Sequence, residues 1–198
     1  SFYCYELGAT SEYARALMAD KNHWVRKLPG QLVQNIISHG IARIAEHFES
    51  DCPTVVAHGF TSAQLRKMGE EEIVDELRVI LSENGSTTGY FTFSSQMRPS
   101  LHQFRIYGPA NGLISDQDNE TLIRLRGARY KSYLEQFVAP VQFAKQYARC
   151  AARNGRLFLK RDFHAKAGMK YLIESFYRSI TEHTPPPIPY DQILRTAR

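Results

Sequence analysis

The segment from Gln31 to Phe48 carries the residues best suited to proton chemistry. Its apolar residues recur at helical spacing, and Asn35 and His39 are four residues apart, so they project from one face, one turn apart. A histidine can act as a general acid or base near neutral pH, and an asparagine can orient a hydroxyl group. The simpler interpretation is a structural pair bonded to backbone or water. A zinc site is not expected, because no further ligands stand at typical spacing.

Three other residues are candidate substrate contacts. Arg26 could bind through a forked hydrogen bond, and Trp24 could pack on the face of a sugar. Both residues fit equally well in a loop anchored on the core. Arg98 follows a predicted strand and could face a cleft, although most such arginines are solvated. His164, which follows two cationic residues and Asp162, is a weaker candidate.

The elements that must position these residues alternate between strand and helix patterns. Period-two patterns and turn signals such as Asn84-Gly85 predict an antiparallel sheet. The expected strands are 1–7, 53–60, 72–81, 89–96, 104–108, 113–116 and 121–125. The expected helices are 9–20, 31–48, a segment after Gly127 interrupted at Pro140, 168–181, and one from about residue 191, with residues 23–30 as a loop. Runs of strands flanked by helices predict an α+β fold.

Length and composition exclude several classes of protein. The 198 residues are 43% hydrophobic and 12% aromatic, which fits one folded domain and excludes a disordered chain. The three cysteines are too few and too widely spaced for a disulfide scaffold, so a reducing, cytoplasmic location is expected. No apolar run is long enough for a membrane-spanning helix, and no partnership with a membrane is expected. The strand-like start and the unterminated final helix predict that both ends are cut.

The net charge of +5 hides a strong asymmetry along the chain. Residues 124–170 hold twelve Lys and Arg against Glu135 and Asp162, so this stretch carries +10 and the rest sums to −5. Three interpretations remain open: a footprint for nucleic acid or an anionic membrane, a solvated helical face, or a preference for an anionic substrate such as a nucleotide sugar or uronate. Nucleic acid is not expected as a partner, because no recognised RNA- or DNA-binding motif accompanies the charge.

The order of several motifs resembles one enzyme family. Trp24 and Arg26 lead into a turn at Gly30 and then into the helix that bears Asn35 and His39. Further along, the stretch from Tyr107-Gly108 to Asp116 has the pattern of a strand pair, and residues 168–198 read as helix, Pro-rich link and helix. This order is similar to the C-terminal domain of the glucose-fructose oxidoreductase and inositol dehydrogenase (Gfo/Idh/MocA) family.

The resemblance implies an open, mainly antiparallel sheet with helices on one face, formed by residues 1–198 as a single domain. It implies that a separate N-terminal Rossmann domain, absent from this chain, binds NAD or NADP, since neither GxGxxG nor the family's Glu-Lys-Pro motif is present. His39 then exchanges the hydroxyl proton of a sugar, polyol or sugar derivative, and the free sheet face makes a homo-oligomer. Asn35 stands where the family has aspartate, and an amide cannot take a proton. The alternative is a non-catalytic dimerisation or ligand-binding module with the same fold.

Overall fold

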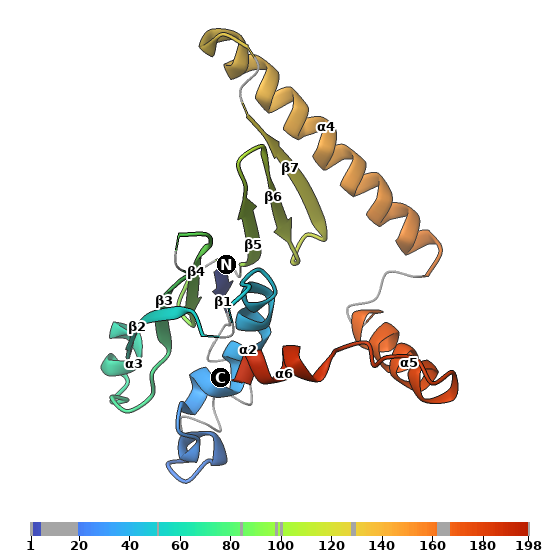
Figure 1. The fold of residues 1–198 in the computed structure, drawn as a ribbon. Coiled ribbons are helices and arrows are strands. Elements are labelled where there is room, and N and C mark those ends of the chain that lie inside the picture. Colours follow the sequence, from blue (N-terminus) through green and yellow to red (C-terminus); the bar gives the residue numbers. More distant parts are fainter. Residues whose placement is uncertain are drawn as a thin grey trace. The chain divides into compact units, whose positions relative to one another are not determined.

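The computed structural model describes residues 2–4, 20–50, 52–83, 85–97, 99, 101–127, 130–161 and 167–197. The helix expected over 9–20 therefore lies almost wholly outside the described residues. The chain forms two compact units, which we describe separately: Ser1–Gln103 with Asp191–Arg198, and Phe104–Tyr190 (Figure 1). The expected organisation as one domain over residues 1–198 stays a prediction.

The strands follow the order β2-β3-β4-β1-β5-β6-β7. β1 pairs with β4 in parallel, whereas β1–β5, β2–β3, β3–β4 and β6–β7 are antiparallel. The strands are β1 (Phe2–Cys4), β2 (Thr54–Phe60), β3 (Glu76–Ser82), β4 (Thr88–Ser94), β5 (His102–Tyr107), β6 (Asn111–Asp116) and β7 (Thr121–Arg126). The helices are η1 (Trp24–Lys27, a 3-10 helix), α2 (Gln31–Ala45), α3 (Ala63–Lys67), α4 (Ser132–Leu159), α5 (Ala167–Thr181) and α6 (Tyr190–Ala197). The predicted α+β class with a mainly antiparallel sheet is confirmed.

The core of the first unit lies between α2 and one face of β3 and β4. The register pairs Leu77 with Phe93 and Val79 with Phe91, and all four side chains are buried. Because side chains alternate across a strand, their neighbours face the other way. Gly40 of α2 packs so closely that a Cβ atom there would lie 2.3 Å from the Phe91 ring. A glycine is therefore required at this crossing of helix and sheet.

The opposite face of these strands presents apolar side chains outward. Val56, Ile80 and Tyr90 are register neighbours on β2, β3 and β4, and their exposed fractions are 62%, 45% and 64%. In this unit one sheet face is covered by a helix and the other exposes an apolar row.

In the second unit, α4 runs along the outer edge of β7 (Figure 1). Four helix residues advance about 6 Å and two strand residues advance about 6.6 Å, so the two repeats stay in step. Side chains one turn apart on α4 accordingly bond the backbone of alternate β7 positions: Gln146 to Arg124, Cys150 to Leu122, and Asn154 to Glu120 at the adjoining turn. These bonds close an edge that would otherwise present unpaired backbone groups.

Two local predictions were wrong, and one short helix was not predicted. The helix after Gly127 is not interrupted at Pro140, because α4 continues through it. Proline removes one backbone donor, but Pro140 and Gln136 are both exposed, so water can bond the carbonyl that loses its partner. The loop expected over 23–30 contains η1. No pattern in the sequence indicated α3, which begins at Ala63 with Ser62 as its N-cap.

Candidate functional site

The helix α2 begins after a turn that Pro29 and Gly30 form. Gly30 is the N-cap, and its N–H donates to the side-chain Oε1 of Gln34 at 3.0 Å. Asn35 and His39 both lie on α2, as predicted, four residues apart. Their side chains lie outside the described residues, so their chemical roles stay predictions. Arg98 and His164 lie outside the described residues as well.

Trp24 and Arg26 lie on η1, immediately before α2, and their side chains have contrasting environments. Trp24 is 56% exposed, and its indole stacks on the ring of His23, with ring centroids 5.9 Å apart. Val25 between them is fully buried, and the side chain of Arg26 is only 6% exposed. The turn of η1 therefore anchors itself through Val25 and Arg26 and leaves Trp24 at the surface.

Arg26 is held by a buried carboxylate. Its Nη2 donates to Oε2 of Glu70 at 2.6 Å, and its Nη1 lies 3.6 Å from Oε2 of the exposed Glu72. Lys21 reaches the same Glu70 oxygen at 3.4 Å. Oε1 of Glu70 accepts the backbone N–H groups of Glu72, at 2.9 Å, and of Ile73, at 3.3 Å. This carboxylate ties η1 to the segment that precedes β3.

The charge on Glu70 is strongly stabilised. Burial alone raises its pKa, but the hydrogen bond and charge of Arg26, the backbone N–H of Glu72 and Lys21 together lower the pKa from 4.5 to about 2. The carboxylate is therefore ionised at neutral pH, and Arg26 is occupied by a structural partner. The observed contacts describe the anchoring role of Arg26, while its predicted contact with substrate stays untested.

Sequence reasoning missed a second group of buried acids at the start of β3. Oδ1 of Asp75 accepts the N–H of Ser62 at 2.6 Å, and Oδ2 accepts from Ser95 Oγ at 2.5 Å and Gln96 Nε2 at 3.0 Å. Glu76 is bound in a similar way by neighbouring side chains on β3 and β4. The one available signal was the acidic composition of residues 70–76, and it does not tell buried from solvated acids.

Among the described residues, no group of three or more His, Cys, Asp or Glu side chains is arranged to hold a metal ion. Within the same part of the chain, no helix has the length and apolar character needed to cross a membrane.

Comparison with known proteins identifies the fold. No protein-family model matches the sequence, and no curated protein does either. The structure matches the crystal structure of an oxidoreductase from Thermotoga maritima with a TM-score of 0.53 and 13% sequence identity. This likeness shows the fold alone: the chain has the fold of one part of that oxidoreductase. The match covers 98% of this chain and 47% of the other, so this chain spans about half the length of that oxidoreductase.

Proposed function

We propose that this chain is the substrate domain of an NAD(P)-dependent oxidoreductase of the glucose-fructose oxidoreductase type, which acts on a sugar, polyol or sugar derivative. The observation that carries the proposal is the fold likeness, which takes in nearly the whole chain and about half of a known oxidoreductase. The order of residues from Trp24 through His39 to the final helix supports the same family.

The cofactor belongs to the other half of the enzyme. The sequence has no glycine-rich fingerprint between a strand and a helix, and the described sheet is mainly antiparallel. A dinucleotide is normally held where a parallel strand meets a helix N-terminus, so the residues present here do not fit it. NAD or NADP is accordingly assigned to a separate domain.

This chain supplies the proton transfer and the substrate contacts in the proposal. His39 takes or returns the proton of a substrate hydroxyl group, and Asn35 orients that hydroxyl or the imidazole. The exposed indole of Trp24 offers a flat apolar face against which a sugar ring can pack. Arg26 positions Trp24 through its anchor on Glu70.

A homo-oligomer through the free sheet face is part of the same proposal. The row of Val56, Ile80 and Tyr90 crosses three adjacent strands and is largely exposed within one chain. Exposed apolar rows of this kind mark sites of protein association.

A non-catalytic dimerisation or ligand-binding module is the second candidate. Asn35 favours it, because an amide stands where the family has a carboxylate, and an amide cannot exchange a proton. Such a module would retain the fold and would still self-associate, but it would not catalyse a reaction.

A turnover screen separates the two candidates. The protein is assayed together with its dinucleotide-binding domain for reduction of NAD and of NADP over a panel of sugars, polyols and uronates, and the 198-residue chain alone serves as the control. The proposal predicts turnover of at least one compound class by the two-domain protein and none by the chain alone. No turnover on any compound, from a protein that still self-associates, would instead establish the non-catalytic module.

A further inference from the structure

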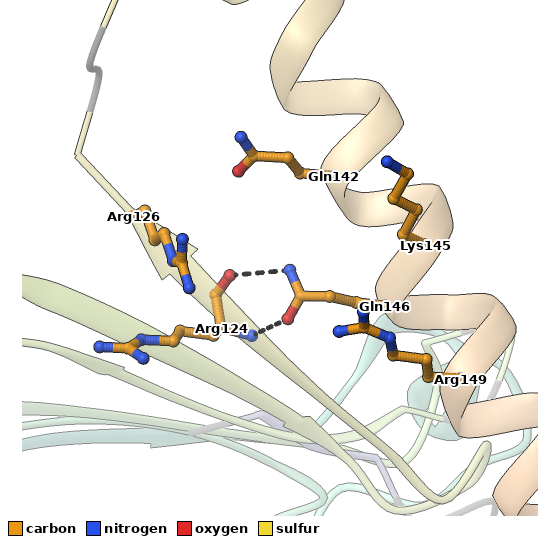
Figure 2. A pocket seen from close by; sticks show the side chains of 6 residues that line it. All are labelled: Arg124, Arg126, Gln142, Lys145, Gln146 and Arg149. Atoms are coloured by element: carbon orange, nitrogen blue, oxygen red, sulfur yellow. Dashed lines mark hydrogen bonds between the residues drawn. The ribbon is translucent and has the colours of Figure 1, made fainter.

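The second unit contains an open cleft between β7 and the middle of α4, with a volume of about 410 Å³ (Figure 2). Six of the described residues line it: Arg124, Arg126, Gln142, Lys145, Gln146 and Arg149. Four of them are cationic, and no carboxylate is among them. A cavity of this size falls in the range of sites for small ligands, which is about 300–1,000 Å³.

The local geometry explains why these residues line one cleft. Arg124 and Arg126 are two residues apart on β7, so they project from the same face of the strand. Residues 142, 145, 146 and 149 follow the i, i+3, i+4, i+7 spacing, which gathers them on one side of α4. Strand and helix therefore each contribute a pair of cations to the cleft.

Gln146 fixes the distance between the two elements. Its Oε1 accepts the backbone N–H of Arg124 at 2.8 Å, and its Nε2 donates to the carbonyl oxygen of Arg124 at 3.1 Å (Figure 2). Both ends of the amide are thus engaged with the strand. Gln146 shapes the cleft, and the four cations remain available to a ligand.

No described acidic side chain compensates the positive charge of the residues that line the cleft. Within the part of the chain that the structure describes, none of Arg124, Arg126, Lys145 and Arg149 forms an ion pair with an acidic side chain. Like charges gathered around a concave site raise the local concentration of anions. An anionic ligand would therefore complement the positive charge of these four residues.

We propose that this cleft binds a compact oligophosphate, meaning a ligand with two or three linked phosphoryl groups. Arginine presents a planar fork of N–H donors that matches phosphate oxygens, and lysine adds a point charge. Two strand residues span about 6.6 Å and a helical turn about 5.4 Å, so the cations are spread over the length of a short phosphate chain. Each phosphoryl group carries one to two negative charges. A chain of two or three such groups therefore balances four cations better than a single carboxylate would. The site stands independently of the oxidoreductase assignment.

Binding of sodium tripolyphosphate to the full 198-residue chain tests the site, with isothermal titration calorimetry at low and at physiological salt. The test variant R124Q/R149Q removes one cation from each element and keeps the backbone bonds of Gln146. The matched control, R156Q/R178Q, removes the same charge from exposed positions on α4 and α5 outside the cleft lining. A second pair, R126Q/K145Q, repeats the test with the remaining two cations.

The proposal predicts one tripolyphosphate per chain, with affinity that falls as salt increases. Either cleft pair should weaken binding about tenfold or more, and the control pair less than about threefold. Equal weakening by the cleft and control pairs would overturn the proposal in favour of diffuse surface charge. Absence of binding at low salt would also overturn it.

Parallel arms identify the source of the phosphate. Vesicles that contain phosphatidic acid and a single-stranded oligonucleotide are offered under the same conditions. Retention of either one, without binding of free tripolyphosphate, would show that the cations serve a membrane or a nucleic acid and would overturn the proposal. Competition by free tripolyphosphate against both would support it.

Discussion

The buried pair of Arg26 and Glu70 leads to a sharp prediction about stability. Glu70→Gln keeps the shape of the side chain and an oxygen that can still accept the N–H groups of Glu72 and Ile73. The substitution removes only the negative charge that faces Arg26 at 2.6 Å. Arg26, with a side chain only 6% exposed, would then be left without that charge.

The magnitude follows from the shift in pKa. The pKa of Glu70 falls from 4.5 to about 2 on folding, and each unit corresponds to about 1.36 kcal/mol, so ionised Glu70 stabilises the folded state by about 3 kcal/mol. Because the folded-state pKa is lowered, this stability is present above pH 4.5 and is lost as the pH falls from 4.5 towards 2. At neutral pH, Glu70→Gln should therefore lower the free energy of unfolding by about 3 kcal/mol, in line with other broken buried pairs.

Urea denaturation gives the measurement, followed by circular dichroism and by the fluorescence of Trp24, the single tryptophan, which lies two residues from Arg26. Glu72→Gln is the matched control, because the side chain of Glu72 is 72% exposed and lies 3.6 Å from Arg26. That control should change the free energy of unfolding by less than about 0.5 kcal/mol. Between pH 4.5 and 2, the wild-type protein should lose stability more steeply than the Glu70→Gln variant.

Two results would refute this reasoning. One is equal stability of the Glu70→Gln and Glu72→Gln variants at neutral pH. The other is an identical loss of stability in acid for the wild-type protein and the Glu70→Gln variant, since the lowered pKa requires the two curves to converge.

Three further substitutions test the packing of each unit. Gln146→Leu should remove both bonds to the β7 backbone, lower the free energy of unfolding by about 1–2 kcal/mol, and speed hydrogen exchange of the Arg124 amide; unchanged exchange would contradict the edge contact. Gly40→Ala should destabilise by about 1–3 kcal/mol in urea denaturation because its Cβ meets the Phe91 ring, whereas helix propensity alone predicts a gain of about 1 kcal/mol. Asp75→Asn should lower the thermal midpoint, with a loss of about 2 kcal/mol, because its amide cannot accept all three donors now bound to the carboxylate; an unchanged midpoint would refute the buried network.

The regular elements could be predicted from sequence because their patterns are local. The spacing of apolar residues located α2 and α5, and the alternation around Gly85, at a φ of +79°, located the hairpin of β3 and β4. The five-residue α3 is too short to show a period. The proline rule failed in α4 because Pro140 is exposed, where water can replace the missing bond.

The site was predictable only in part, because its contacts join distant residues. The position of Asn35 and His39 on one helix follows from their spacing. By contrast, Arg26 and Glu70 are 44 residues apart, and nothing in either segment shows that they meet. The excess of positive charge over residues 124–170 was visible in the sequence, but a cleft between α4 and β7 was not. The cleft lies between β7 and one face of α4, and this placement depends on the two hydrogen bonds that Gln146 makes to the backbone of β7.

The central claim is that this chain contributes the proton-transferring residue of an oxidoreductase, and one comparison tests it directly. The rate of NAD(P)H formation is measured with the protein, its dinucleotide-binding domain and its best substrate, for His39→Ala and for His47→Ala as a matched histidine control. We predict a fall in kcat of about 100-fold or more for His39→Ala, with loss of the pH dependence near neutrality, and nearly unchanged kcat for His47→Ala. Equal turnover by the wild-type protein and the His39→Ala variant would contradict the account.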